Sequence, residues 1–297
     1  MLILNGYKES YPVGNQLVAI YRSSLKINAA AQIIFEGARE HAREKGFRLF
    51  PFDLTQRGLT SARITDILHT RGIRGVIINP LTYEPGLLLP LVVGIDWQYF
   101  SVVSISQNIA PLHVHCVAPN HGYSMQFQLD ELRELGYRRI GLEIRPRVND
   151  STKGTMLGPF LADQITRPKS EWIPPLFSEQ MDAKILGRWC RRHQPDCIIA
   201  SGPKLMPFVQ KLGYRVPQDI GFSMVSRGPD SPYAGSTENH AKLGAASVDS
   251  VISLLQGTEQ GLPLFPRITL IEGSWVWKPT LRPPKSVTQE SGPVPVI

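Results

Sequence analysis

Two spacings of apolar residues alternate along the chain. Short runs that are apolar on both faces, such as residues 16–23 (QLVAIYRS) and 75–79 (GVIIN), predict strands buried in a parallel sheet. Stretches with apolar residues three and four positions apart, such as residues 28–47, predict amphipathic helices. Further strands are predicted at residues 48–53 and 100–105, and further helices at 61–71 and 85–93. This alternation predicts a parallel sheet covered by helices on both faces.

A second series of similar size begins after a predicted strand at residues 112–117. Its predicted strands are 139–144, 171–175, 196–201 and 219–225, and its predicted helices are 121–137, 157–165, 181–193 and 204–214. A long final helix is predicted at residues 240–257. The two series predict an α/β fold with two doubly wound parallel-sheet lobes, which bind ligands at the carboxyl ends of their strands.

The composition is that of a soluble globular protein with a sizeable core. Of the 297 residues, 42% are hydrophobic and 19% are charged, which excludes a mainly disordered chain and a disulfide scaffold. The net charge of +7 is a mild bias toward anionic partners. Three cysteines without metal-ligand spacing predict buried thiols in a reducing compartment. No signal peptide or membrane-spanning run is visible, so we expect a cytoplasmic protein without a membrane partner.

Three segments resemble the effector-binding core of the LacI/GalR family of bacterial transcription regulators. They are residues 132–142 (LRELGYRRIGL), 212–225 (LGYRVPQDIGFSMV), and 243–257 followed by 268–284. Each alone is weak, but together they keep the order and spacing of the family. The resemblance covers residues 16 to 282 and implies the type I periplasmic-binding-protein-like fold.

That resemblance implies a chain that crosses three times between its lobes. The expected parts are a linker remnant (1–15), an N-terminal lobe (16–114 plus 236–264), a C-terminal lobe (115–235 plus 265–283) and a disordered tail (284–297). A three-strand hinge would let the lobes close on a small-molecule effector, and the family implies a homodimer.

Family members carry a helix-turn-helix and a hinge helix of about sixty residues before this core. Only fifteen residues precede the first predicted strand here, too few for three helices. We therefore expect that the chain as given does not read DNA bases. Operator DNA is a partner only if the native protein has such a segment, and a stand-alone sensor remains the alternative.

The resemblance also points to candidate ligand-binding residues after the strands of the first lobe. Asn28 matches the asparagine that opens the family's first helix, and Ser23 and Ser24 occupy the adjacent strand end. Asn120, with His121, stands where the family has an Asp-Asn pair. Asn28 and Asn120 are equally well explained as helix N-caps.

In the second lobe the family's usual chemistry is altered. Thr155 stands in place of an effector-gripping arginine, Ser201 begins the replacement of an Asn-Asp pair, and Ser226 and Arg227 replace an Asp-Asp pair. A threonine cannot form the bidentate contacts of an arginine, so the ordinary sugar pocket is in doubt. Arg227 is a candidate cation for an anionic ligand, with a solvated loop arginine as the favoured interpretation.

The sequence gives little support to the hypothesis of an enzyme or of a bound cofactor. No phosphate-binding loop or nucleophile elbow is present, and no motif calls for a cofactor. His113 and His115 alternate on a predicted strand without a third metal ligand nearby. The basic stretch 188–193 suits a helix C-terminus, with a DNA phosphate contact as the alternative. The leading hypothesis is a non-enzymatic sensor for a small molecule of the carbohydrate type.

Overall fold

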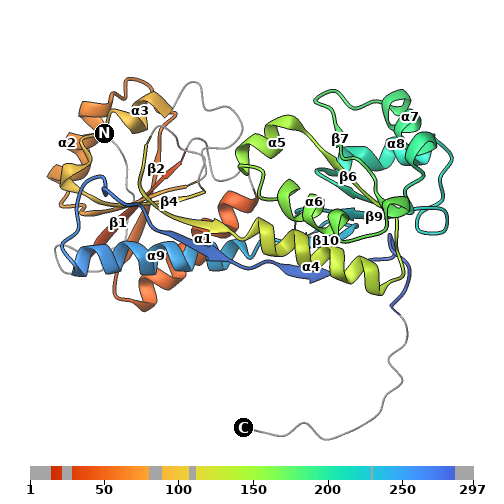
Figure 1. The fold of residues 1–297 in the computed structure, drawn as a ribbon. Helices are drawn as coiled ribbons and strands as arrows, with labels where there is room; N and C mark the ends of the chain where they lie inside the picture. The colour runs from red at the N-terminus through yellow and green to blue at the C-terminus, as the bar shows by residue number, and fades with distance from the viewer. Residues whose placement is uncertain (1–14, 22–28, 80–88, 107–111, 229, 285–297) are drawn as a thin grey trace, which may run out of the picture. The chain divides into compact units, whose positions relative to one another are not determined.

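A computed structural model describes residues 15–21, 29–79, 89–106, 112–228 and 230–284 of the chain (Figure 1). The chain divides into two compact units. Unit 1 comprises residues 1–120 and 238–273, and unit 2 comprises residues 121–237 and 274–297. The polypeptide therefore passes from one unit to the other three times.

Unit 1 is built on a six-stranded sheet with the order β11-β5-β4-β3-β1-β2, and every pairing in it is parallel. Its strands are β1 (Gln16–Tyr21), β2 (Arg48–Asp53), β3 (Gly75–Ile78), β4 (Ser101–Ile105), β5 (His115–Pro119) and β11 (Ile268–Ile271). Its helices are α1 (Ala29–Glu44), α2 (Ser61–Thr70), α3 (Leu89–Val93) and α9 (His240–Gln256).

Unit 2 is built on a second six-stranded sheet with the order β12-β10-β9-β8-β6-β7. Its pairings are parallel except the one between β10 and β12. Its strands are β6 (Ile140–Ile144), β7 (Leu176–Phe177), β8 (Cys197–Ala200), β9 (Gly221–Met224), β10 (Ala234–Thr237) and β12 (Ser274–Val276). Its helices are α4 (His121–Glu134), α5 (Pro146–Ser151), α6 (Leu157–Ile165), α7 (Ala183–His193) and α8 (Met206–Lys211).

Both sheets carry a hydrophobic core on each face, as the doubly apolar strands predict. In β1, Val18 and Ile20 pack in the cluster that includes α2, whereas Leu17 and Ala19 pack in the cluster of α1 and α9. In unit 2, successive residues of β8 alternate between the cluster of α4 and α6 and the cluster of α7 and α8. The predicted α/β fold class with two mostly parallel sheets is confirmed.

The two helices that cover one face of the unit 1 sheet pack at backbone contact (Figure 1). A Cβ atom on Gly244 of α9 would lie 2.1 Å from the carbonyl oxygen of Ile34 in α1. A Cβ atom on Gly37 of α1 would lie 2.5 Å from the carbonyl oxygen of Ala241. Only glycine, which lacks a Cβ atom, allows this approach, so α1 and α9 form one layer against a single face of the unit 1 sheet.

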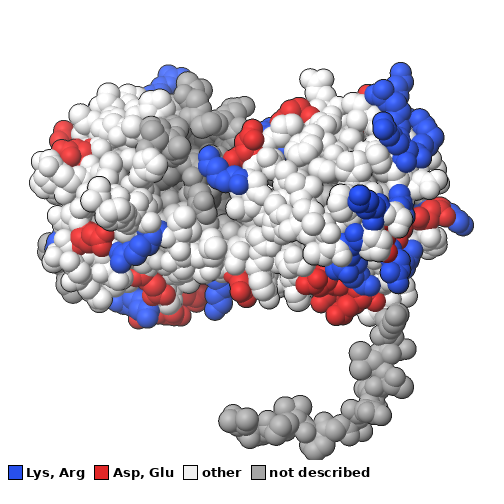
Figure 2. All heavy atoms as spheres, viewed as in Figure 1, with Lys and Arg blue, Asp and Glu red and all other residues white. Residues whose placement is uncertain are grey.

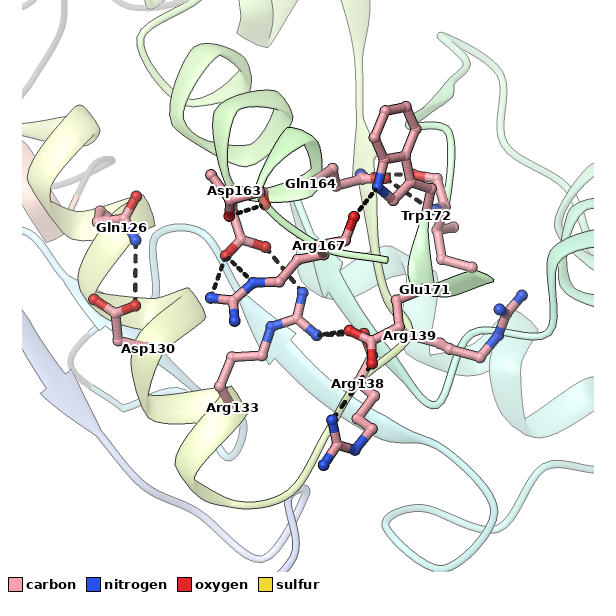
Figure 3. A network of polar contacts seen from close by, with 12 residues as sticks. Gln126, Asp130, Arg133, Arg138, Arg139, Asp163, Gln164, Arg167, Glu171 and Trp172 are labelled. Atoms are coloured by element: carbon pink, nitrogen blue, oxygen red, sulfur yellow. Dashed lines mark hydrogen bonds and ion pairs between the residues drawn. The ribbon is translucent and has the colours of Figure 1, made fainter. Parts of the chain in front are cut away.

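A network of ion pairs joins α4, α6 and the residues that follow each of these helices (Figure 3). The buried carboxylate of Asp163 lies 2.9 Å from an Nη atom of Arg133 and 3.0 Å from one of Arg167. Arg133 also lies 3.6 Å from Glu171, which pairs in addition with Arg138. These contacts tie the end of α4 and the turn after it to α6 and to the 3-10 helix Lys169–Glu171.

The predicted strand at residues 112–117 begins too early. Residues 112–114 are not part of a strand, and β5 begins only at His115, opposite Val103 of β4. The apolar pattern of that segment indicates an extended chain, but it does not show where a neighbouring strand lies alongside.

The predicted strand 171–175 is absent. Its first residue ends a 3-10 helix (Lys169–Glu171), and pairing starts only in β7. Pro174 and Pro175 lack the N–H groups that a sheet ladder needs. The N–H of Ile173 instead donates to the Oε1 atom of Gln164.

Candidate functional site

Three neighbouring strands of unit 2 end at one edge of its sheet. β6, β8 and β9 are parallel and adjacent, so Arg145, Ser201 and the Ser226–Arg227 pair follow one another along that carboxyl edge. Crevices at the carboxyl ends of doubly wound sheets are where such folds bind ligands. This edge is therefore the candidate ligand-binding edge of unit 2.

Glu143 and Ser201 form the centre of a polar cluster at the edge. The Glu143 side chain is 3% exposed, and its Oε2 atom accepts hydrogen bonds from the Ser201 N–H at 2.9 Å and the Ser201 hydroxyl at 3.0 Å. Burial raises the pKa of the Glu143 carboxyl, while the two bonds from Ser201 and the charge of Arg145 oppose that rise. The cluster thus contains a carboxyl group whose proton affinity is increased and whose second oxygen accepts no hydrogen bond from the described residues.

Arg145 completes the cluster with a loosely held cation. Its Nε atom lies 3.4 Å from the Ser201 hydroxyl, and one Nη atom lies 3.4 Å from the Ser201 carbonyl oxygen. The guanidinium lies against Gly202, where a Cβ atom would be 3.3 Å from it. Among the described residues, Arg145 forms no ion pair within 4.0 Å. Most of the N–H donors of Arg145 are therefore available to a ligand.

Arg227 is not the solvated loop residue that the sequence favours. It is 5% exposed, its Nε atom donates to the Tyr233 carbonyl oxygen at 3.0 Å, and one Nη atom donates to the Ser231 carbonyl oxygen at 2.7 Å. Its guanidinium therefore binds the backbone of its own loop. Ser226, the residue before it, is half-buried at the end of β9.

Thr155 lies apart from this cluster, in the turn between α5 and α6. It is exposed, and its hydroxyl donates to the Thr152 carbonyl oxygen at 2.6 Å. Nearby in α5, the Oδ1 atom of Asn149 is buried without a hydrogen-bond partner among the described residues. The sequence did not single out Asn149.

The carboxyl edge of the unit 1 sheet presents Tyr21, Asn79 and Asn120. Asn79 directly follows β3, is 1% exposed, and forms no hydrogen bond of ordinary geometry through either side-chain amide atom within the described ranges. It lies near the Tyr21 hydroxyl, whose pKa is raised by burial and by the charge of Glu36 and is lowered slightly by this amide. A buried amide without satisfied hydrogen bonds is a costly feature in a core.

Asn120 follows β5, and its N–H donates to the Ile271 carbonyl oxygen at 2.7 Å. It directly precedes α4, so both its helix-capping and its ligand-binding interpretations remain open. Ser23, Ser24 and Asn28 lie outside the described residues. The structure thus joins Ser201 to Glu143 and Arg145, and it places Ser226 at the neighbouring strand end.

Glu143 and Asn79 have a signal in the sequence that the resemblance obscures. Each is a polar residue inside or directly after an otherwise apolar strand run, IGLEI or GVII. A buried strand with no solvated face has no place for a charge unless a partner is built for it. Polar residues that interrupt or end an apolar strand run therefore mark Glu143 and Asn79 in the sequence.

Among the described residues, the candidate histidines and cysteines do not form a metal site or a reactive thiol site. The described residues contain no group of three His, Cys, Asp or Glu side chains arranged to hold a metal ion. His115 accepts the Arg267 N–H and contacts Glu259 at 2.7 Å, which lowers the pKa of the Glu259 carboxyl. The three cysteines are buried and free, and burial raises the pKa of the Cys190 thiol to about 11. Within the described ranges, no helix is long and apolar enough to cross a membrane.

Comparison with known proteins gives a fold. No protein-family profile matches the sequence, and no curated protein matches it. Solved structures are similar over about 90% of the chain, among them a LacI-family regulatory protein from Chloroflexus aggregans (TM-score 0.65, 13% identity, 89% of this chain and 98% of that one).

Two similar structures hold sugars. The transcriptional regulator CelR in complex with cellobiose has a TM-score of 0.61 and 14% identity, covering 90% of this chain and 84% of that one. The LacI-family regulator CCPA from Weissella paramesenteroides with bound glucose has a TM-score of 0.60 and 13% identity, covering 89% of this chain and 98% of that one. These likenesses establish the two-unit fold of LacI-family regulators, without a separate DNA-binding domain among the described residues.

Proposed function

We propose that this chain is the ligand-sensing core of a LacI/GalR-type transcription regulator and binds a small molecule of the carbohydrate type. The observation that carries the proposal is the Glu143–Arg145–Ser201 cluster at the carboxyl edge of a doubly wound sheet. Structures with this fold hold cellobiose and glucose. The expected ligand-binding residues are those predicted from the sequence, extended by Glu143 and Arg145.

The cluster offers a hydroxyl-rich ligand both kinds of hydrogen-bonding partner. One carboxylate oxygen of Glu143 accepts no hydrogen bond from the described residues, so it can accept one from a hydroxyl group of the ligand. Arg145 donates in a planar fork to paired oxygens. Glu143 would thereby replace the carboxylate that Ser226 lacks. Ser201 would add a hydrogen bond from the end of β8, the strand beside β6.

In an intact regulator, ligand binding would change DNA affinity through linkage between the two sites. The dimer expected for such regulators gives the two-fold symmetry of a palindromic operator. We expect this chain to act in the cytoplasm and without turnover of its ligand.

The second candidate is a stand-alone small-molecule-binding protein with no DNA role. The same site serves both functions, so the native protein's mass in its source cells separates them. A mass about 6–7 kDa above 33.1 kDa, the weight of roughly sixty further residues, favours the regulator. A mass near 33.1 kDa favours the stand-alone sensor.

Ligand binding is tested by calorimetry and thermal unfolding with a panel of mono- and disaccharides, nucleosides and sugar phosphates. A ligand at 100 times its Kd adds about 2.7 kcal/mol to the free energy of unfolding. Ser201→Ala should weaken binding of the best ligand by more than about 1 kcal/mol, because it removes a hydroxyl from the cluster. Ser253→Ala, on the exposed side of α9, is the control. Equal affinities for the two variants would remove Ser201 from the site.

A further inference from the structure

Positive charge is concentrated in one stretch of unit 2. Residues 183–215, which run from α7 through β8 to α8 and the turn after it, contain a single acidic residue, Asp196. The same stretch contains seven basic residues: Lys184, Arg188, Arg191, Arg192, Lys204, Lys211 and Arg215. Its surplus of six nearly equals the net charge of the whole chain, +7. The bias toward anionic partners is therefore local.

These seven side chains are all exposed, whereas the residues between them build the core. In α7, Lys184, Arg188 and Arg191 follow each other at helical spacing, and Leu186, Trp189 and Cys190 are buried on the opposite side. Figure 2 shows blue side chains gathered where Figure 1 labels α7 and α8. We call the seven residues the α7–α8 basic face.

The acidic groups near this face are already engaged. Asp182, just before α7, caps the helix by accepting the Ile185 N–H at 2.7 Å. Asp196 accepts backbone N–H groups of Arg138 and Arg139 at 2.8 and 3.0 Å. Asp219 pairs with Arg215 at 2.7 Å. Within the described part of the chain, the other six cations of the face form no ion pair.

One end of the face is reinforced by a further cation. The guanidinium of Arg139 donates to the carbonyl oxygens of His193 and Gln194 at the C-terminus of α7. The pKa of His193 is lowered by burial and then by the charges of Arg192 and Arg139, as expected where cations crowd. Holding such a concentration of like charge favours an anionic partner that relieves it.

The chemistry of the face distinguishes between anionic partners. Stable protein interfaces centre on buried apolar or aromatic anchors, and residues 183–215 expose no large apolar side chain. Single-stranded nucleic acids bind by stacking their bases on aromatic rings, and the face has no exposed aromatic residue. The three guanidiniums without an ion pair among the described residues, those of Arg188, Arg191 and Arg192, can each bind phosphate oxygens in a fork, which suits the regular charges of a duplex backbone.

We propose that the α7–α8 basic face binds the phosphate backbone of a nucleic acid duplex without reading its sequence. This inference goes beyond the proposed sensing function and does not depend on any effector. Binding of this kind comes almost entirely from release of counterions condensed on the duplex.

The test is anisotropy of a fluorescein-labelled duplex of twenty base pairs and arbitrary sequence, titrated with the full chain at several NaCl concentrations. About six phosphate contacts predict that log K falls against log[NaCl] with a slope of about −5. The variant R188Q/R191Q/R192Q should flatten that slope by about 2.7 and weaken binding at least tenfold at about 50 mM salt. Glutamine keeps good helix propensity, so α7 should remain folded, as circular dichroism will verify.

The control variant is R39Q/R43Q/K45Q in unit 1, which removes the same number of charges. These cations pair with Glu36, Glu40 and Asp249, so their loss should leave affinity and slope within twofold of the original. Absence of wild-type binding at 50 mM NaCl would overturn the proposal, as would equal losses in both variants. Displacement of the duplex by polyglutamate at equal charge concentration would also overturn it and would assign the face to an acidic protein.

Discussion

Glu143 shows how one residue in an apolar strand can define a site. β6 is buried along its whole length, yet its fourth residue is a carboxylic acid held by the N–H and hydroxyl of Ser201. Burying a carboxylate costs several kcal/mol unless it is paired and hydrogen-bonded. At the carboxyl edge of the sheet, hydrogen bonds from Ser201 offset part of the cost of burying this carboxyl group. A ligand bound at the same edge could offset more of it.

The raised pKa of Glu143 makes a prediction about stability and pH. Its ordinary value is 4.5, and burial raises it in the folded chain, so between the two values the folded state holds more protons than the unfolded state. The contribution of this group to the free energy of unfolding therefore falls as pH rises through the folded pKa. Glu143→Gln, whose Oε1 can still accept from Ser201, should remove that fall.

Urea unfolding from pH 4 to pH 8 measures the effect. The difference in unfolding free energy between Glu143→Gln and the original chain should grow with pH, in favour of the variant. Glu40→Gln on the exposed surface of α1 is the matched control. A constant difference across this range would show that the carboxyl of Glu143 titrates alike in the folded and unfolded states.

At the scale of elements, backbone contact between α1 and α9 determines how unit 1 is layered. Gly244→Ala places a methyl group 2.1 Å from the Ile34 carbonyl oxygen, and backbone cannot move aside as a flexible side chain can. Overpacking of this kind costs about 1–3 kcal/mol, which should outweigh alanine's better helix propensity. Gly257→Ala at the end of the same helix meets only an ordinary contact at 3.4 Å and should change stability by less than about 0.5 kcal/mol.

Chemical denaturation of both variants compares the two sites directly. Equal stabilities would mean that α1 and α9 have room between them. Neither glycine stood out in the sequence, because a helical glycine looks the same whether it faces solvent or another helix. Periodicity predicts which face of α9 is buried, but the partner and its distance come only from the folded chain.

The elements that the sequence predicted well are those with strong periodicity and clear ends. The helices at 61–71 and 240–257 lie within one residue of α2 and α9 at each end. The failures at 112–114 and 171–175 share a physical cause. Apolar runs report burial, whereas strand pairing depends on a neighbour that lies far away in the sequence and on N–H groups that proline lacks.

The candidate site was only partly accessible to the same reasoning. Ser201 and Ser226 stand at adjacent strand ends, where the resemblance expected them. Arg227 was misjudged because a loop sequence does not reveal which of its own carbonyl oxygens the side chain reaches. Glu143 was missed because the candidate residues were chosen at positions that match the family's binding residues, and Glu143 is not at one of them.

At the scale of the whole molecule, two surfaces of unit 2 are proposed to bind different partners. The carboxyl edge of unit 2 is proposed to bind an uncharged or anionic small molecule, and the α7–α8 basic face is proposed to bind a duplex backbone. Each has its own variants, Ser201→Ala and R188Q/R191Q/R192Q, and neither set should affect the other's readout. If one set alters both readouts, the two surfaces are coupled.

The proposed function requires that this chain binds a small molecule and does not transform it. Native mass spectrometry of the chain, after incubation with the low-molecular-weight fraction of its source cells, tests this directly. We predict one small molecule bound per chain, released chemically unchanged, and lost in Ser201→Tyr, which fills the carboxyl edge of unit 2. A chain that stays unliganded, or that releases an altered compound, would contradict the account.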